Sequence, residues 1–217
     1  MPKEKIFRAS IFILTIPYFV LERIISYFNV ISINSDFNLC CEKISNFSIK
    51  NIEIIDENLI KTLVLAEDHR SRLHYGIDPI AIIRTLKLRL INKRTQGAST
   101  IEQQLIRTIT RRYEKTPRRK VREQILAIML CRKFTKKKIA ECYLGLAYYG
   151  SGITGENGLL KIKNNETNNR REISISYLKY PKPKLDNENH TKKIIKRANH
   201  IINLNSKNEN VSLFLRK

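Results

Sequence analysis

The sequence lacks paired metal-binding cysteines and regular alternation of polar and apolar residues, and it has few acidic residues relative to basic ones. No two of its four cysteines are separated by two residues, which excludes a zinc finger and provides no disulfide framework. We therefore expect Cys40, Cys41, Cys131 and Cys142 to be small buried apolar residues. Neither a persistent period-2 pattern nor an internal repeat is present, which argues against a β fold.

Acidic residues are half as numerous as basic ones: 20 Asp and Glu against 41 Lys and Arg, a formal net charge of +21. The excess is concentrated, because residues 84–138 contain 18 basic and three acidic residues. Such a charge attracts nucleic acid, an anionic membrane surface or a phosphorylated substrate; a solvated charged surface is the alternative. With 217 residues, 42% of them hydrophobic, the chain is globular and long enough for one domain with a core.

The N-terminal 34 residues contain the longest apolar stretch. Basic residues precede an apolar run that starts at Ile6, is interrupted by Glu22–Arg23 and continues to Ile33. A transmembrane helix needs about 20 apolar residues, so the run is marginal. The basic flank favours an N-inside orientation, and no small-residue cleavage site is present. We expect residues 1–34 to be an uncleaved membrane anchor; the alternatives are an interfacial amphipathic helix and an ordinary core helix.

The remaining sequence is helical in pattern, so we expect a mostly α fold. Residues 35–55 are expected to be a polar connector and residues 56–217 to form one domain. Asp56 is placed to cap a helix that ends near Glu67, and Pro79 to begin one that reaches Asn92. Further helices are expected after Ser99 to about 111, from 117, over 136–147, over 172–180 and around 190–204, with a loop over 156–171.

The most informative segment, Gln96–Leu105, reads Gln-Gly-Ala-Ser-Thr-Ile-Glu-Gln-Gln-Leu. Its Gly-Ala-Ser-Thr turn leads into a helix that Ser99 or Thr100 can cap with a hydroxyl. The N-terminus of that helix directs free N–H groups at an anion such as a phosphate. Two acidic positions flank the segment, Glu67–Asp68 before it and Glu123 after it, so the pattern indicates an anion site with carboxylates beside it.

Four ordered motifs resemble glycosyltransferase family 51, the peptidoglycan glycosyltransferases found alone or as the first domain of bifunctional penicillin-binding proteins. The matching segments are Ala66–Asp68 with His74–Asp78, Gln96–Leu105, Arg119-Lys120-x-x-Glu123, and Lys138–Leu144 with Tyr148–Gly150. The match covers residues 56–155 well and 156–185 weakly. It implies a lysozyme-like helical fold with a small membrane-facing jaw lobe, on an enzyme that polymerises lipid II at the outer face of the cytoplasmic membrane.

The sequence departs from the family pattern at three places. An aromatic residue of the first motif is replaced by Ser71, and the Asn of the fourth motif is replaced by Gly145. The Ala-rich helix expected near 172–180 is instead Glu-Ile-Ser-Ile-Ser-Tyr-Leu followed by Lys179. His69 and His74 lack zinc-motif spacing, and we expect His74 to be a structural hydrogen bonder.

The resemblance implies a role for each matching residue. Glu67 is the general base that takes the proton of a sugar 4-hydroxyl, and Glu123 is the second catalytic carboxylate, which orients basic side chains or a divalent cation. The reaction is an inverting transfer that releases undecaprenyl pyrophosphate. The residues expected to bind substrate are Asp68, Ser99, Thr100, Gln103, Gln104, Arg107, Lys115, Arg119 and Lys120. Mg²⁺ or Mn²⁺ on the diphosphate is compatible with this chemistry, although no metal ligand is certain and the sequence has no all-protein metal cage.

The resemblance also implies partners: lipid II, the growing glycan strand, the anionic membrane and penicillin-binding transpeptidases, but no nucleic acid. It places the chain in the bacterial cytoplasmic membrane, single-pass, with its domain on the outer side. Two alternatives stay open. The departures favour a catalytically impaired lipid II- or membrane-binding module of the same fold. The charged segment alone favours a basic nucleic-acid-binding helical protein, and no nucleic-acid-binding motif supports that interpretation.

Overall fold

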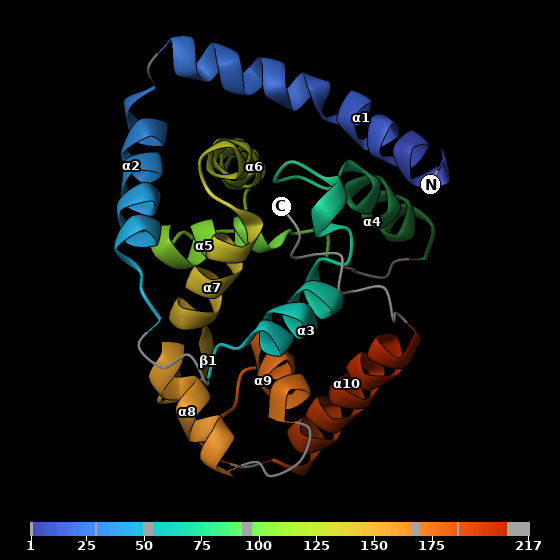
Figure 1. Ribbon diagram of the computed structural model, residues 1–217, viewed down its shortest axis with the longest axis vertical. Coiled ribbons are helices and arrows are strands. Elements are labelled where there is room, and N and C mark those ends of the chain that lie inside the picture. The colour runs from blue at the N-terminus through green and yellow to red at the C-terminus, as the bar shows by residue number, and fades with distance from the viewer. Residues whose placement is uncertain are drawn as a thin grey trace. The chain divides into compact units, whose positions relative to one another are not determined.

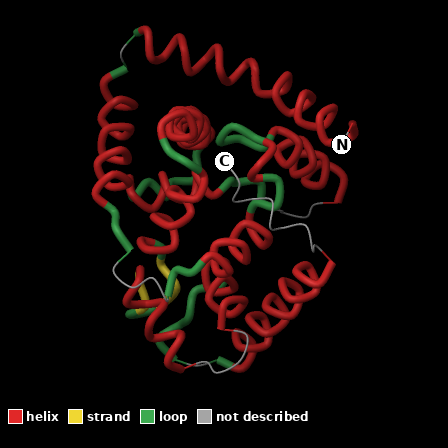
Figure 2. Tube along the Cα trace, in the orientation of Figure 1, coloured by secondary structure: helices red, strands yellow, loops and turns green. Residues whose placement is uncertain are grey.

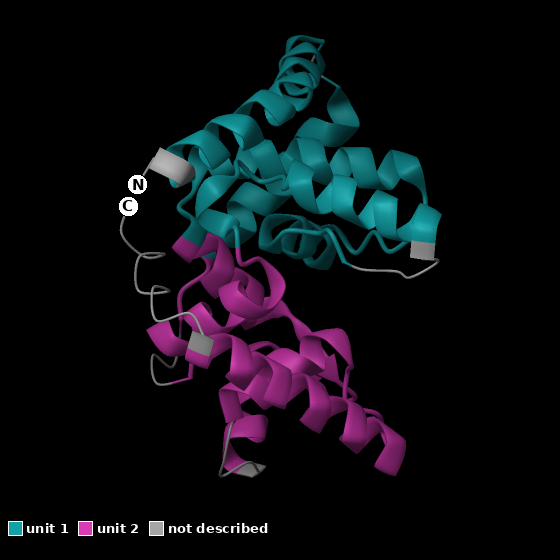
Figure 3. Ribbon diagram, turned by 90° about the vertical axis from the view of Figure 1, so that its right-hand side faces the viewer, with its two compact units in different colours: residues 1–46, 70–136 teal, residues 47–69, 137–217 magenta. Residues whose placement is uncertain are grey.

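The computed structural model of the chain describes residues 2–28, 30–49, 54–92, 97–165, 170–185 and 187–207 (Figure 1). Helices make up most of these residues, with one short β-hairpin, and this confirms the expected mostly α fold (Figure 2). The chain forms two compact units. Unit 1 comprises residues 1–46 and 70–136, and unit 2 comprises residues 47–69 and 137–217 (Figure 3).

Unit 1 is built around one central helix, α6, which Figure 1 shows nearly end-on. α6 (Pro117–Lys133) contacts α1 (Pro2–Tyr27), α2 (Ile31–Asn46) and α5 (Ile101–Thr110). Its buried residues include a continuous run over 123–128, so this helix is surrounded on most sides. The short 3₁₀ turn η1 (Ser71–Leu73) and α4 (Pro79–Asn92) contact α1 and complete the unit.

Unit 2 contains the first helix that follows residue 50 and most of the C-terminal half of the chain. α3 (Glu57–Glu67) contacts α9 (Arg170–Lys179) and α10 (Glu188–Lys207). The hairpin of β1 (Tyr148–Gly150) and β2 (Ile153–Thr154) follows α7 (Lys136–Leu146) and contacts α8 (Gly155–Asn165). The two strands are antiparallel, with Tyr148 opposite Thr154.

Helix starts agree with the sequence where a cap or a proline marks them. The Asp56 carboxylate accepts the Leu59 N–H at 2.7 Å and caps α3, which ends at Glu67 as expected. α4 has the bounds predicted from its first proline, Pro79–Asn92. Three of the four cysteines, Cys40, Cys41 and Cys142, are buried as expected, whereas Cys131 is half-buried, and none of the four forms a disulfide.

Two stretches differ from the expectation because their few apolar residues are helically spaced. The prediction of a loop over 156–171 was wrong, because the first part of this stretch is helical and belongs to α8. Leu159 and Ile162 of α8 are buried and lie three residues apart. The stretch 35–55, expected to be a polar connector, begins inside α2, where Ile33, Cys40 and Ile44 form the buried stripe. The domain boundaries at 34/35 and 55/56 stay predictions.

The N-terminal helix is apolar but also packs within unit 1. Among the described residues, Glu4–Tyr27 is the one helical stretch long and apolar enough to cross a membrane. Most of it is exposed, yet Ile11 and Thr15 are fully buried. The buried carboxylate of Glu22 pairs with Arg132 of α6 at 2.6 Å. A carboxylate with such a partner anchors one end of α1 to α6.

Candidate active site

A hydrogen-bond network in unit 1 joins the first two motifs at one backbone carbonyl. Thr100 caps α5, and its Oγ1 accepts the Gln103 N–H while donating its own proton to the carbonyl of Gly76 at 2.8 Å. The Nε2 of Gln103 donates to the same carbonyl at 3.3 Å. Both side chains are buried, so α5 is fixed against the turn that holds Gly76. The predicted cap is therefore confirmed, with Thr100 rather than Ser99 in that role.

Only glycine fits at position 76. Its φ is +90°, and a Cβ atom there would lie 2.4 Å from the carbonyl oxygen of Ala127 in α6. The Gly76 N–H donates to Nδ1 of His74 at 3.2 Å, which confirms the expected structural role of that histidine. The missing side chain allows the His74–Gly76 part of the first motif to lie directly on the backbone of α6.

Glu123 is the centre of a charge cluster in the same unit. Its carboxylate is almost completely buried, and Arg107 binds it through two hydrogen bonds, Nε to Oε1 at 2.9 Å and Nη2 to Oε2 at 3.0 Å. Arg119, one helical turn earlier in α6, donates to Oε1, and the Lys120 ammonium lies 3.9 Å from Oε2. Three cations thus share one carboxylate, which leaves a net positive charge for an anion.

Lys120 connects this cluster to the start of α5. Its Nζ donates to Oγ of Ser99 at 2.9 Å and to Oε1 of Gln103 at 2.5 Å. Burial lowers the pKa of Lys120 to about 8; Arg107 and Arg119 add to the effect, whereas Glu123 opposes it. The ammonium is therefore charged at neutral pH but poorly solvated, which suits it to an anionic ligand.

Glu67 and Asp68 lie at the end of α3 in unit 2. The Asp68 backbone N–H donates to the Val64 carbonyl at 2.9 Å and closes the helix, and its side chain is buried. The Glu67 carboxylate pairs with Arg197 of α10 at 3.0 Å, and its side chain is 17% exposed. Glu67 is thus a largely desolvated acid at a helix terminus, with an arginine as its ion-pair partner.

The other predicted substrate-binding residues differ in their surroundings. Gln104 is half-buried in the first turn of α5, whereas Lys115 is exposed in the segment between α5 and α6. The cluster around Glu123 therefore brings together Arg107, Arg119 and Lys120. Lys115 is close to them in the sequence but is exposed and is not shown in contact with Glu123. Gln96, the first residue of the second motif, lies outside the described residues.

Another buried ion pair in unit 1 was not predicted. Glu102 is completely buried, and its Oε1 pairs with Lys136. Burial alone would raise the pKa of Glu102, but the charge of Lys136 and its hydrogen bond to the carboxylate oppose this, and the pKa is lowered to about 2. Cys131 donates its thiol proton to the same oxygen at 3.3 Å. In the sequence Glu102 resembles any polar residue of an amphipathic helix, so nothing there signalled its burial.

The departure at Gly145 has a structural explanation. A Cβ atom at Gly145 would lie 2.2 Å from the ring of Phe47. Lys138 donates to the Phe47 carbonyl at 2.6 Å, and its ammonium lies 5.6 Å from the ring centre. Phenylalanine therefore occupies the space that an asparagine at this position would need.

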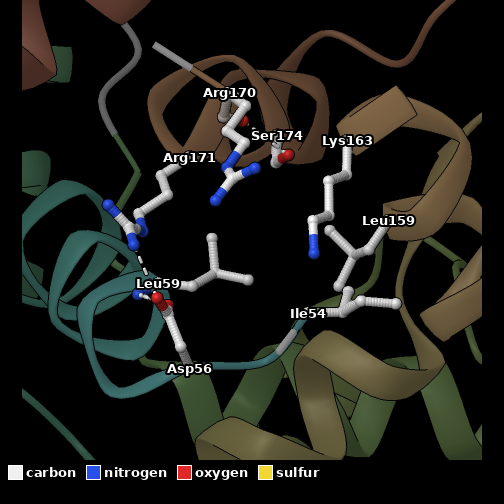
Figure 4. A pocket seen from close by; sticks show the side chains of 8 residues that line it. All are labelled: Ile54, Asp56, Leu59, Leu159, Lys163, Arg170, Arg171 and Ser174. Atoms are coloured by element: carbon white, nitrogen blue, oxygen red, sulfur yellow. Dashed lines mark hydrogen bonds and ion pairs between the residues drawn. The ribbon is translucent and has the colours of Figure 1, made fainter. Parts of the chain in front are cut away.

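A small basic pocket lies in unit 2 at the opposite end of α3 from Glu67 (Figure 4). Its volume of about 30 Å³ admits one or two water molecules. Arg171 pairs with Asp56 at 2.6 Å on its wall. Because α3 has 11 residues and is therefore about 16 Å long, this pocket is separate from Glu67. Its lining residues are Ile54, Asp56, Leu59, Leu159, Lys163, Arg170, Arg171 and Ser174.

Comparison with known proteins agrees with these features. The family model described as transglycosylase matches residues 39–204. Penicillin-binding protein 1A of Aquifex aeolicus is 43% identical over 109 residues, which are 48% of this chain and 15% of that protein. Penicillin-binding protein 1A of Escherichia coli is 38% identical over 100 residues, 46% of this chain and 12% of that protein. Penicillin-binding protein 1B of Haemophilus influenzae is 39% identical over 93 residues, 42% and 12% respectively.

The helical fold and the motif network define a glycosyltransferase with a lysozyme-like fold. More narrowly, the chain belongs to the transglycosylase family, glycosyltransferase family 51. The chain spans far less than two thirds of the length of the curated relatives it matches. The predicted family is confirmed, and the role of each site residue stays a prediction.

Proposed function

We propose that the chain is a membrane-anchored peptidoglycan glycosyltransferase that polymerises lipid II into glycan strands. The observation that carries this proposal is the cluster of Arg107, Arg119 and Lys120 around buried Glu123, on the motifs of a transglycosylase. A leaving diphosphate gains negative charge in the transition state. Cations already held in place stabilise that charge without reorganisation, which is a large catalytic contribution.

The reaction we propose is a single displacement. Glu67 accepts the proton of the sugar 4-hydroxyl. At the same time the oxygen of that hydroxyl forms a bond to the anomeric carbon of the second sugar. The bond from that carbon to the diphosphate oxygen breaks, and its electron pair stays on the diphosphate. The configuration at the carbon inverts, and undecaprenyl pyrophosphate leaves. Arg107 and Arg119 suit phosphate oxygens because guanidinium binds them in a planar fork, and Lys120 adds a point charge.

Glu123 does not fit the role of a divalent-cation ligand. Its Oε1 accepts hydrogen bonds from two arginines, and its Oε2 accepts one from Arg107 and faces Lys120. A metal ion there would also be repelled by three positive side chains. We therefore propose that Glu123 orients the cations, and no step of the reaction passes through a metal on this residue.

The proposal extends to the location and partners of the chain. We propose that Glu4–Tyr27 holds the chain in the bacterial cytoplasmic membrane, with the basic N-terminus inside and the residues that follow this helix outside. The substrates are then lipid II and the growing strand, and the positive charge favours the anionic membrane surface. Penicillin-binding transpeptidases are the protein partners that the proposal includes, since they cross-link glycan strands; nucleic acid is not a partner.

The test is polymerisation of labelled lipid II by detergent-purified protein, with and without Mg²⁺, resolved on a gel. We expect polymer from the wild type and none from Glu67→Gln, which keeps the shape of the side chain but cannot accept the proton. Glu57→Gln is the matched control, because Glu57 is an exposed acid of the same helix. Lipid II bound by a folded wild type that makes no polymer would instead support the impaired binding module. Full polymerisation by Glu67→Gln would remove Glu67 as the base.

A further inference from the structure

We infer that Arg197 is a positioning residue for Glu67: it holds the carboxylate of the candidate base in place from helix α10. This inference rests on the proposed function, because it assigns a part in the reaction to a residue that the motifs do not include. Arg197 lies 130 residues from Glu67 in the sequence, in a helix that was expected only as the last element of the fold.

One guanidinium nitrogen of Arg197 makes both contacts. Its Nη2 donates to Oε1 of Glu67 at 3.0 Å and to the backbone carbonyl of Ala66 at 2.8 Å. The Ala66 carbonyl is in the last turn of α3, where carbonyl groups have no partner within the helix. Arg197 therefore fixes the carboxylate relative to the helix end that carries it, and its positive charge is favourable at this negative end.

The contact is shielded from water. The side chains of Arg197 and Glu67 are 16% and 17% exposed. The Nε–H of Arg197 is buried and has no hydrogen-bond partner among the described residues. A buried donor without a partner is costly, and in a native structure it calls for an explanation. The constraint on Glu67 supplies one, because the guanidinium is oriented for the carboxylate and not for its own complete hydrogen bonding.

Packing of α10 does not depend on Arg197. Ile194, Ala198 and Ile201 of α10 are buried at helical spacing and form the apolar stripe of this helix. α10 contacts α3 and α9. Removal of the guanidinium should therefore leave the helix in place while releasing the Glu67 side chain to other rotamers.

The experiment compares the steady-state kinetics of lipid II polymerisation for Arg197→Ala and for Lys196→Ala, which removes an exposed cation from the neighbouring position. We expect Arg197→Ala to lower kcat about 100-fold, the loss typical of a misplaced catalytic group, with KM nearly unchanged and the protein still folded at the assay temperature. Added guanidinium ion should restore part of kcat, whereas urea at the same concentration should not. Lys196→Ala should behave as the wild type. Wild-type kcat in Arg197→Ala, or a loss that follows unfolding and is not restored by guanidinium, would overturn the inference.

A second readout separates this inference from the proposed function. In ¹⁵N-arginine-labelled protein, one guanidinium should show slowly exchanging Nη protons that disappear in Arg197→Ala and exchange faster in Glu67→Ala, which removes the accepting carboxylate. If that signal is present and the wild type makes no polymer, the proposed function fails and the positioning contact stands. If the wild type makes polymer but no arginine signal depends on Glu67, the positioning role fails alone.

Discussion

Glu123 carries one negative charge and contacts three positive ones, so its surroundings determine what it can do. Both of its oxygens accept hydrogen bonds from Arg107, which fixes the guanidinium plane. Truncating a buried partner of such a pair is usually more damaging than its net contribution suggests, because the remaining charges lose their compensation. In the proposed reaction the carboxylate therefore acts through the cations that it holds.

Lys120 gives the site a pH dependence that can be measured. Its pKa of about 8 means that it is mostly charged at pH 7 and loses its proton as the pH rises through 8. We expect kcat/KM for lipid II to fall above pH 8 with a slope of one proton, because kcat/KM reports groups of the free enzyme. Lys120→Arg should move this fall to higher pH, since arginine stays protonated, whatever its effect on the maximum rate.

Lys137→Arg, at an exposed lysine of α7, is the control for that experiment. Its alkaline limb should match the wild type. An identical limb in wild type and Lys120→Arg would show that some other group titrates.

At the scale of helices, the sequence predicted what local chemistry determines. Asp56, Thr100 and Pro79 mark helix starts by side-chain caps or a fixed φ, and the structure has helices starting at all three. The sequence did not predict α8, because its apolar residues are outnumbered by Asn and Lys. Only their burial in the structure shows that these apolar residues form a stripe. Helix starts are thus local properties, whereas the burial of a sparse stripe depends on the rest of the fold.

The residues of the candidate site also fall into two groups: those that a local motif identifies and those that only the folded structure reveals. The carboxylates and basic residues could be named from ordered motifs, and the structure adds which of them share contacts. Arg197 could not be named, because it lies in a Lys- and Asn-rich helix and its partner is 130 residues away. The role of Gly76 as a shared acceptor was also invisible, since a backbone carbonyl has no sequence signature.

Close packing of Gly76 on the backbone of α6 makes this residue a strong test of the fold. We expect Gly76→Ala to destabilise the protein by about 3 kcal/mol, because the methyl group meets the Ala127 carbonyl and φ is positive. Thermal unfolding checks this. Gly97→Ala is the matched control, since a Cβ at Gly97 meets nothing within 4 Å. Equal midpoints for the two variants would contradict the packing described here.

For the molecule as a whole, charge and apolar surface are separated along the chain. The net charge is +21, and the basic excess lies in residues 84–138, after the apolar N-terminal helix. Apolar side chains of α1 remain exposed, among them Ile13 and Val20, which are 62% and 52% exposed. Charge alone would allow a reversible membrane contact, whereas exposed apolar residues along a long helix favour insertion.

These two modes of membrane attachment respond differently to salt. We expect the full chain to stay with vesicles of neutral lipid in 1 M salt, where the Debye length is about 3 Å and surface attraction is screened. Replacing Ile13 and Val20 together by aspartate should weaken this retention, because charged side chains are costly in the bilayer. Complete release of the unmodified chain by salt would show that charge, and not α1, holds it.

The central claim, polymerisation by displacement, is tested most directly by measuring undecaprenyl pyrophosphate release and glycan polymer in the same reaction of purified protein with labelled lipid II. The account predicts one diphosphate lipid released for each disaccharide added to a strand, with both products absent in Glu67→Gln. Diphosphate release without polymer would show hydrolysis in place of transfer. Binding of lipid II with neither product would contradict the account and leave a binding protein with the same fold.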